Sequence, residues 1–309
     1  MRIAVLDVGT NTLRLLIRER SSSIVIFRKN YYLFLGSSCI NGVLSKEGLE
    51  RLNSALTEIK EILSANKVSK VIGVATAFAR NIKNSEELFQ TIKSVLPCDI
   101  RLIDGKTEGT IVALAVSEWF RPVGDFLVID AGGGSTEFIY KSNKGFLVES
   151  HEFGSLVLTN NFFTTYPPNE SDVNRLFEYL HTKLATLPAL PPSISVFGVG
   201  GTFTTAAFLL SGKDVYDSNE INGYPIHIDE LETFYNEILK LKYEQLLSRY
   251  PLEEGRERVL LAGVIEVLEI MKTLDIGVIR ASDISLIDGV LPYFKDLYDL
   301  KSIENAFSS

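Results

Sequence analysis

The chain has 309 residues, of which 46% are hydrophobic, and its formal net charge at pH 7 is −8. This length and apolar content allow a large buried core in one or two domains, and the negative charge argues against a general nucleic-acid-binding protein, although it does not exclude a polyanionic substrate. No apolar stretch reaches the roughly 18 residues of a membrane span, and residues 1–6 lack the pattern of an export signal. The sequence therefore predicts a cytoplasmic protein with no nucleic-acid or membrane partner.

The first half of the chain predicts three strands followed by alternating helices and strands. The three strands are apolar runs separated by a turn at Gly9 and by the serines at 21–23. Ser45 is a suitable N-cap, because leucine and isoleucine recur at helical spacing after it. The predicted order is βββαβαβα, with strands at 3–6, 13–18, 24–28, 71–75 and 100–103 and helices from 45, over 85–95 and over 108–119.

The second half of the chain repeats this order, which indicates an internal duplication. The proline-rich segment 188–192 ends a helix before the fourth predicted strand. The predicted strands are at 126–129, 137–140, 146–150, 194–197 and 278–281, and the predicted helices are near Leu156, over 171–187, from about Thr202, over 229–241 and 254–274, and from about Ser285.

One motif occurs once in each half. The segments IAVLDVGTNTLRLLI at 3–17 and FLVIDAGGGSTEFIY at 126–140 both contain an apolar run, an aspartate, a turn rich in small polar residues and a second apolar run. Glycine leaves backbone N–H groups accessible to phosphate oxygens, and an adjacent aspartate can bind a divalent cation. Each half is therefore predicted to contribute one phosphate-binding turn.

The residues of these two turns are the candidate ligands. Asp7 and Asp130 are candidate metal ligands, although aspartate before glycine is also ordinary turn chemistry. Three consecutive glycines are more than a hairpin needs, so they indicate the close approach of a ligand to the backbone. The candidate phosphate-binding residues are Gly9, Thr10, Asn11 and Thr12 in the first turn and Gly132, Gly133, Gly134, Ser135 and Thr136 in the second.

Five motifs in order resemble the exopolyphosphatase/guanosine pentaphosphate phosphohydrolase (Ppx/GppA) family in its short form. They are DVGTNTLRLLI at 7–17, VATAFAR at 74–80, IDGKTEG at 103–109, VIDAGGGSTEF at 128–138 and FGVGGTFTTAA at 197–207. The resemblance covers nearly the whole chain. It implies the α/β, two-lobed actin-like (ribonuclease H-like) fold, with mixed sheets and helices on both faces.

The implied lobes are residues 1–120 together with about 293–309, and residues 121–292. Ligands of such sheets bind outside the strand ends, where both aspartate turns are expected. We therefore expect the two turns to face one another across a cleft and to hold one phosphate chain.

The resemblance also implies roles for single residues. Glu108 corresponds to the catalytic base, which would accept a proton from the attacking water, although by position alone it is an acid in the first turn of a helix. Arg80, at the end of a predicted strand, would bind phosphate oxygens or form a surface ion pair. Glu137 would lie near the metal. The residues Gly200, Gly201 and Thr202 resemble a third glycine element that approaches a nucleotide or the far end of the substrate.

Two further arginines are open to two interpretations. Arg14 follows the first turn and could face solvent, and Arg256 matches an arginine of the family but could be a charge on a helix surface. Four positions differ from the family pattern: Thr107, Thr110, Arg258 and Ile287. These differences leave the chain-length preference open, together with the choice between polyphosphate and guanosine pentaphosphate.

The leading hypothesis is a phosphohydrolase that releases terminal orthophosphate from inorganic polyphosphate or guanosine pentaphosphate, with Mg²⁺ or another divalent cation as cofactor. The alternatives are an ATP-dependent kinase of the same superfamily, a non-catalytic sensor of guanosine tetraphosphate or pentaphosphate, and a polymerising actin-like protein. Similarity to the family also implies a homodimer.

Overall fold

The computed structural model describes residues 1–19, 24–143, 145–191, 194–253 and 255–290. The chain divides into two compact units, Met1–Ile111 with the segment that begins at Leu286, and Val112–Ser285. Residues 293–309, assigned above to the first lobe, and the serines of the predicted turn at 21–23 lie outside the described residues. The proposed lobe limits therefore stay a prediction, and each unit is described by itself.

The first unit contains a five-stranded sheet with the order β3-β2-β1-β6-β7. β1 (Arg2–Val8), β2 (Thr12–Glu19) and β3 (Val25–Tyr32) form an antiparallel meander. β6 (Val68–Ala75) and β7 (Asp99–Leu102) extend the sheet in parallel from β1. β1 is buried over almost its whole length, as expected for a central strand with helices on both faces of its sheet.

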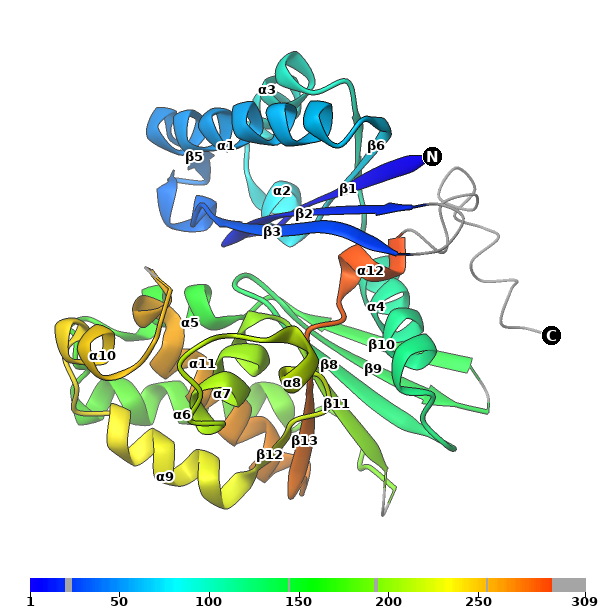
Figure 1. Ribbon diagram of the computed structural model, residues 1–309. Coiled ribbons are helices and arrows are strands. Elements are labelled where there is room, and N and C mark those ends of the chain that lie inside the picture. The colour runs from blue at the N-terminus through cyan, green and yellow to red at the C-terminus, as the bar shows by residue number, and fades with distance from the viewer. Residues whose placement is uncertain (20–23, 144, 192–193, 254, 291–309) are drawn as a thin grey trace. The chain divides into compact units, whose positions relative to one another are not determined.

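Two helices, α1 (Lys46–Ala65) and α3 (Ser85–Val95), cover one face of this sheet (Figure 1). α1 begins after Ser45, whose side chain accepts a hydrogen bond from the Gly48 N–H, so the predicted N-cap is confirmed. Aliphatic side chains from the sheet and from these helices form one core; they include Leu6, Leu15, Leu52, Leu56, Ile59, Leu88 and Ile92.

The opposite face of the first sheet carries α12 (Leu286–Val290). Its buried Asp288 accepts a hydrogen bond from Arg18 Nη2 at 3.0 Å and forms a second ion pair with Arg28. Because α12 is the last described helix, the first unit is built from two stretches of sequence that are far apart in the chain. The other elements that begin in this unit are a 3₁₀ turn at Leu35–Ser38, β4 (Cys39–Ile40), β5 (Val43–Leu44), α2 (Ala77–Asn81) and α4 (Gly105–Phe120).

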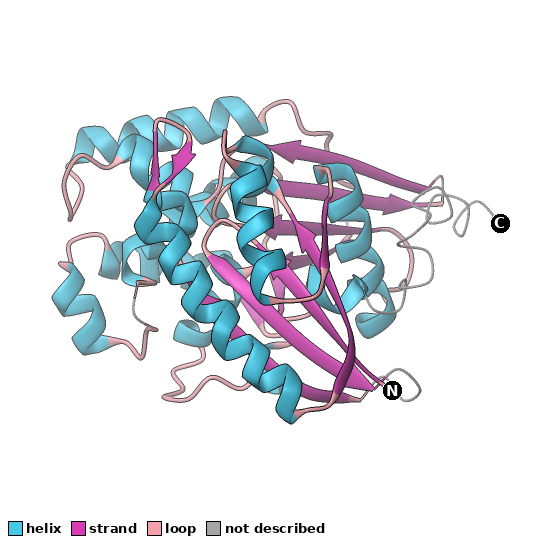
Figure 2. Ribbon diagram, turned by 90° about the horizontal axis from the view of Figure 1, so that it is seen from above, coloured by secondary structure: helices cyan, strands magenta, loops and turns pink. Residues whose placement is uncertain are grey.

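The sheet of the second unit repeats this topology. β8 (Phe126–Ala131), β9 (Thr136–Ser142) and β10 (Gly145–His151) form an antiparallel meander, and β11 (Ser195–Val199) and β13 (Val278–Ser282) follow in parallel. An additional edge strand, β12 (Pro225–His227), completes the order β10-β9-β8-β11-β13-β12. The predicted duplication of βββαβαβα is thus confirmed in both units, and Figure 2 shows the resulting mixture of strands and helices.

The helices of the second unit surround α11 (Glu257–Thr273), which is buried along most of its length. Its apolar residues join those of the sheet and of the neighbouring helices in the larger of the two cores (Figure 1). On the opposite face of the sheet, Phe120 at the end of α4 packs on Phe197 of β11, with ring centroids 4.9 Å apart. The remaining helices are α5 (Ser155–Phe162), α6 (Glu170–Leu184), α7 (Gly201–Leu210), α8 (Ser218–Ile221), α9 (Ile228–Ile238) and α10 (Tyr243–Arg249).

Three details differ from the sequence prediction. Arg80 lies in the short helix α2 and not at the end of a strand, because β6 already ends at Ala75. The helix expected over 254–274 begins only at Glu257, since Gly255 has a φ of 90° that an α-helix cannot include. The short elements α2, α8, α10, β4, β5 and β12 were not predicted. In the described part of the chain, none of the helices has the length and apolar character needed to cross a membrane.

Candidate active site

The Gly132–Ser135 turn of the second unit joins β8 to β9. The Gly132 N–H donates to Ser135 O at 3.0 Å and closes the turn. Three N–H groups at the start of α5 donate to carbonyl oxygens of the turn, all at 3.1 Å. Ser155 donates to Gly132 O, and Leu156 and Val157 both donate to Gly133 O. With its carbonyl oxygens facing α5, the turn has N–H groups left with which to bind an anion, as in other glycine-rich phosphate loops.

Gly154 allows this close approach of α5. A Cβ at this position would lie 2.5 Å from Gly132 O, 2.8 Å from Gly133 C and 3.0 Å from Gly134 N. All three are backbone atoms of the turn. Gly154 has extended backbone angles that any residue adopts, so it is the packing against the turn that requires glycine.

The third glycine element lies beside the same turn. Gly200 has a φ of 94°, and a Cβ there would lie 2.6 Å from Ala131 O and 3.0 Å from Asp130 Oδ1. α7 begins directly after it, so the N-terminal N–H groups of this helix are placed next to the end of β8. A helix N-terminus carries partial positive charge and favours a bound anion.

Arg256 adds a full positive charge to this element. Its guanidinium packs directly on Gly201, where a Cβ would lie 2.3 Å from Nη2 and 2.4 Å from Nη1. The sequence left open whether Arg256 belongs to the site or is a charge on a helix surface. Its contact with Gly201 favours the first interpretation. Arg256 precedes α11, and Gly263 of α11 packs against Thr202, so this one helix positions both the cation and the start of α7.

Asp130 and Glu137 face each other as cross-strand partners on β8 and β9. Asp130 is half-buried, and Glu137 is 2% exposed and accepts a hydrogen bond from Ser150 Oγ at 2.7 Å. Glu137 is therefore not the solvated acid that a strand start might suggest. Thr136, the residue before Glu137 on β9, is fully buried, and its hydroxyl contacts Phe153 O and Glu266, so this side chain anchors the turn from inside the protein.

These carboxylates suit a magnesium ion. Among the described residues, no group of three or more His, Cys, Asp or Glu side chains is arranged to hold a metal. Mg²⁺ commonly uses one or two carboxylates together with water and substrate phosphate oxygens. The cross-strand pair Asp130 and Glu137 fits that kind of donor set in the second unit, and Asp7 offers a single carboxylate in the first.

The Gly9–Thr12 turn of the first unit is built like the turn of the second. The Gly9 N–H donates to Thr12 O at 3.0 Å, as Gly132 does to Ser135. Thr10 O and Asn11 O accept hydrogen bonds from residues 33–36, which replace α5 in this role. Both turns thus direct their carbonyl oxygens toward the protein, which is the arrangement expected for a turn whose N–H groups bind phosphate.

Asp7 pairs with Arg14 across β1 and β2. Arg14 Nη1 donates to Asp7 Oδ2 at 3.3 Å, so Arg14 does not simply face solvent. Asp7 is 5% exposed. Burial raises the pKa of this carboxyl above its ordinary value, and the charge and hydrogen bond of Arg14 act in the opposite direction.

Glu108 and Arg80 form an ion pair in the first unit. Arg80 Nη1 lies 3.4 Å from Glu108 Oε2 and also donates to Ile103 O at 2.5 Å. Glu108 is 8% exposed, which distinguishes it from an ordinary surface acid in the first turn of a helix. Asp104 accepts a hydrogen bond from the Thr107 N–H and so fixes the turn that carries Glu108. Hydrogen bonding from the backbone and side chain of Thr107 lowers the pKa of Asp104.

Each unit brings its predicted residues together at one edge of its sheet. In the first unit, the Gly9 turn, α2 and α4 follow the carboxyl ends of the neighbouring strands β1, β6 and β7. In the second, the Gly132 turn and Gly200 follow those of β8 and β11. The convergence of the two sets on one phosphate chain stays a prediction. The pairing of Arg14 with Asp7 was missed, although the two residues lie opposite each other across the predicted turn.

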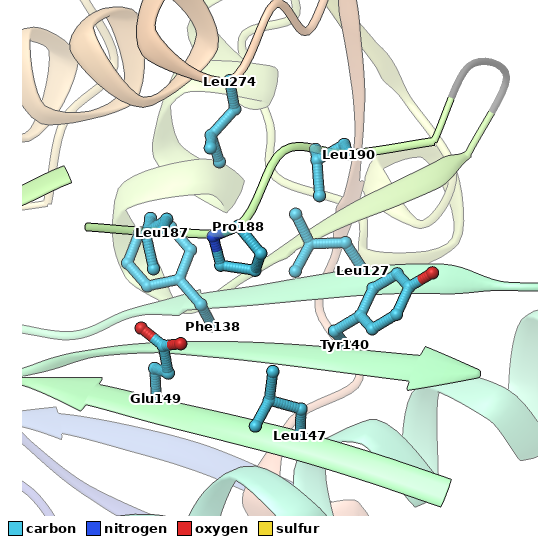
Figure 3. A pocket seen from close by; sticks show the side chains of 9 residues that line it. All are labelled: Leu127, Phe138, Tyr140, Leu147, Glu149, Leu187, Pro188, Leu190 and Leu274. Carbon is cyan, nitrogen blue, oxygen red and sulfur yellow. The ribbon is translucent and has the colours of Figure 1, made fainter. Parts of the chain in front are cut away.

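Two hollows elsewhere do not suit a polyanion. One, of about 20 Å³, has room for little more than a water molecule. Its lining is apolar apart from Tyr140 and Glu149, the one charged residue among the nine side chains labelled in Figure 3. The other is an open groove of about 520 Å³ on α1 and β3, where Glu47, Glu50 and Glu58 outnumber Arg51. The first hollow has no cationic donor in its lining, and the acids of the second outweigh its one arginine, so neither suits a phosphate chain.

The chain is similar in sequence to known proteins. The model of the Ppx/GppA phosphatase family matches residues 17–295. Exopolyphosphatase 2 of Mycobacterium tuberculosis is 27% identical over 94% of this chain and 97% of its own length, and a putative exopolyphosphatase of Haemophilus influenzae is 26% identical over 94% and 90%.

Solved structures confirm the predicted fold class. A Ppx/GppA family member from Aquifex aeolicus is 29% identical, with a TM-score of 0.80 over 97% of this chain and 99% of its own. An exopolyphosphatase from Cytophaga hutchinsonii, 24% identical over 96% and 98%, has the same fold with a TM-score of 0.83. The α/β fold of the actin-like type is therefore established.

Proposed function

Because the chain belongs to the Ppx/GppA phosphatase family, we propose that it hydrolyses the terminal phosphoanhydride bond of inorganic polyphosphate and releases orthophosphate. The observation that supports this proposal is the arrangement of the second unit, in which two glycine elements and Arg256 adjoin the carboxylates of β8 and β9. Polyphosphate is preferred to guanosine pentaphosphate because the Mycobacterium tuberculosis and Haemophilus influenzae relatives described above are named exopolyphosphatase and putative exopolyphosphatase.

The N–H groups of the Gly132–Ser135 turn and of the start of α7 hold the terminal phosphate in this proposal, and Arg256 neutralises part of its charge. A magnesium ion held by Asp130 and Glu137 would supply further charge neutralisation at the phosphate oxygens. Positioning and charge neutralisation are the main requirements of phosphoryl transfer, since the protein itself forms no covalent bond.

Glu108 acts as the general base. It accepts a proton from the attacking water as the new P–O bond forms and the bond to the bridging oxygen of the chain breaks. The products are orthophosphate and a chain shortened by one phosphate. Arg80 orients Glu108 through the ion pair at 3.4 Å, and the bond from Arg80 to Ile103 O fixes the position of the arginine.

Phosphate release tests this function. The assay offers polyphosphate, guanosine pentaphosphate and ATP in parallel, with and without Mg²⁺. Magnesium-dependent release from polyphosphate supports the proposal. Release of ADP that requires an added acceptor would instead indicate a kinase, and binding of guanosine pentaphosphate without release would indicate a sensor.

The variant Glu108→Gln tests the assignment of the base. We expect a fall in kcat of at least roughly a hundredfold, because general-base catalysis contributes about 10²–10⁴-fold, with affinity for tripolyphosphate nearly unchanged. Glu118→Gln is the matched control, because Glu118 is an exposed acid on the same helix. Equal turnover in Glu108→Gln and Glu118→Gln would remove Glu108 from the mechanism.

The same family membership leads us to infer a homodimer. Analytical ultracentrifugation of the whole chain tests this directly, and a monomer at micromolar concentration would contradict it.

A further inference from the structure

Glu266 is a buried acid in the middle of α11. Its exposed fraction is 0%, and its neighbours along the helix are aliphatic residues of the core. Its Oε1 lies 2.5 Å from Thr136 Oγ1, whereas its Oε2 is buried without a hydrogen-bond partner among the described residues. An ionised carboxylate in such a place would be strongly unfavourable, because the described residues provide no cation for either oxygen and no hydrogen-bond donor for Oε2.

The hydrogen bonds of Thr136 indicate which group carries the proton. Thr136 Oγ1 lies 3.0 Å from Phe153 O as well as 2.5 Å from Glu266 Oε1. A hydroxyl has one proton, and a backbone carbonyl can only accept. Both contacts are hydrogen bonds when Thr136 donates to Phe153 O and a protonated Glu266 donates to Thr136.

The surroundings favour the protonated acid. The pKa of Glu266 is raised to about 8, chiefly by burial; the contact with Thr136 lowers this pKa, and the charge of Glu137 contributes to raising it. A neutral group behind the anion site also adds no repulsion to a bound phosphate.

We propose that Glu266 is a positioning residue of the phosphate site, which as a neutral acid donates to Thr136 and so fixes the Gly132–Ser135 turn. The inference rests on the function proposed above. Thr136 is the residue at which the turn enters β9, and Phe153 precedes the glycine that packs on the turn. The chain of bonds from Glu266 through Thr136 to Phe153 thus ties α11 to the turn and to the segment that leads into α5.

The position of α11 explains why this connection affects substrate. Arg256, just before the helix, contacts Gly201, and Gly263 packs on Thr202. Through its hydrogen bond with Thr136, Glu266 connects the same helix to the Gly132–Ser135 turn. Loss of this link would let the Gly132 turn shift relative to Arg256 while the apolar packing of α11 remains.

Two variants separate positioning from packing. Glu266→Gln keeps a donor, because its amide can donate to Thr136, whereas Glu266→Met keeps the length of the side chain without one. We expect Glu266→Met to bind tripolyphosphate about tenfold more weakly in titration calorimetry and to raise KM more than it lowers kcat. Glu266→Gln should stay within about twofold of the wild type. These magnitudes correspond to one buried hydrogen bond.

The thermal stability of Glu266→Met should not fall together with its affinity for tripolyphosphate. Glu266→Met removes the unpartnered buried oxygen, so its melting temperature should equal or exceed that of the wild type, which a merely structural role would not produce. In addition, Glu266→Met combined with Thr136→Val should bind no more weakly than either single variant. Infrared spectra at pH 7 should contain a protonated carboxyl band that is absent in Glu266→Gln.

Three results would overturn the inference: unchanged tripolyphosphate affinity in Glu266→Met, equal weakening in Glu266→Gln, or no protonated carboxyl band in the wild type. The infrared spectrum and Glu266→Gln still decide the question if Glu266→Met does not fold. If the wild type releases no phosphate from polyphosphate, the proposed function fails, while the tripolyphosphate titrations still test Glu266.

Discussion

Replacement of Gly154 by alanine isolates the contact between α5 and the Gly132–Ser135 turn. The backbone of Gly154 is extended, with φ −172° and ψ 172°, so alanine adopts it without strain. The added Cβ, however, would lie 2.5 Å from Gly132 O, whereas ordinary contact begins at 3.4 Å. The two segments must therefore separate by about 0.9 Å, the difference between these distances.

This separation acts on the hydrogen bonds that hold the turn. The three bonds from the start of α5 to Gly132 O and Gly133 O are 3.1 Å long, so the added distance would break most of them. With about 0.5–1.5 kcal/mol for each of two broken bonds and about 1–3 kcal/mol for overpacking, we expect Gly154→Ala to lower the free energy of unfolding by about 2–6 kcal/mol. The displaced N–H groups should weaken tripolyphosphate binding by roughly tenfold or more.

Urea denaturation and titration calorimetry measure both effects. Gly277→Ala is the control, because a Cβ at Gly277 meets no atom within 4 Å and its φ lies outside the left-handed region. The reasoning is refuted if Gly154→Ala lies within about 0.5 kcal/mol of the control, the usual range of surface substitutions, and binds tripolyphosphate with wild-type affinity.

Two further predictions concern charged groups. Arg256→Ala should weaken tripolyphosphate binding by roughly ten- to hundredfold, as expected for one charge-assisted hydrogen bond; Arg258→Ala, at an exposed position two residues away, should not, and equal effects in calorimetry would contradict the assignment. Asp172 accepts hydrogen bonds from Thr164 and Arg175, which lower its folded pKa below 3.8. This contribution to stability is present above the unfolded pKa and is lost as the pH falls through the folded pKa. Asp172→Asn should therefore be less stable than the wild type in urea at pH 7, and the difference in free energy of unfolding should narrow at pH 3. An equal difference at both pH values would contradict a stabilising role of the ionised Asp172.

The two aspartate turns could be predicted from sequence because each is a local pattern. An apolar run, an aspartate and consecutive small residues specify strand, turn and strand without reference to the rest of the chain. The N-cap at Ser45 and the leucine stripe after it are equally local. These signals repeat in both halves, so the duplicated topology could be predicted with them.

The parts that could not be predicted depend on packing between distant segments. Arg80 was expected at the end of a strand, but it lies in α2, and a helix of this length has too few residues to display helical periodicity. The contact of Arg256 with Gly201 joins residues far apart in sequence. Glu266 lies among aliphatic residues of α11, where an acid normally indicates the solvent-facing side of a helix, and only the tertiary structure reveals its burial.

The clamp of Arg18 and Arg28 on Asp288 has a consequence for biosynthesis. Both arginines belong to the opening meander of the chain, but their carboxylate partner is made only near its end. During synthesis on the ribosome, the two guanidinium groups of the first sheet lack this counter-charge until the whole second unit has emerged. The second unit is thus free to complete its fold first, and a nascent chain arrested before Leu286 should leave the N-terminal sheet susceptible to proteases.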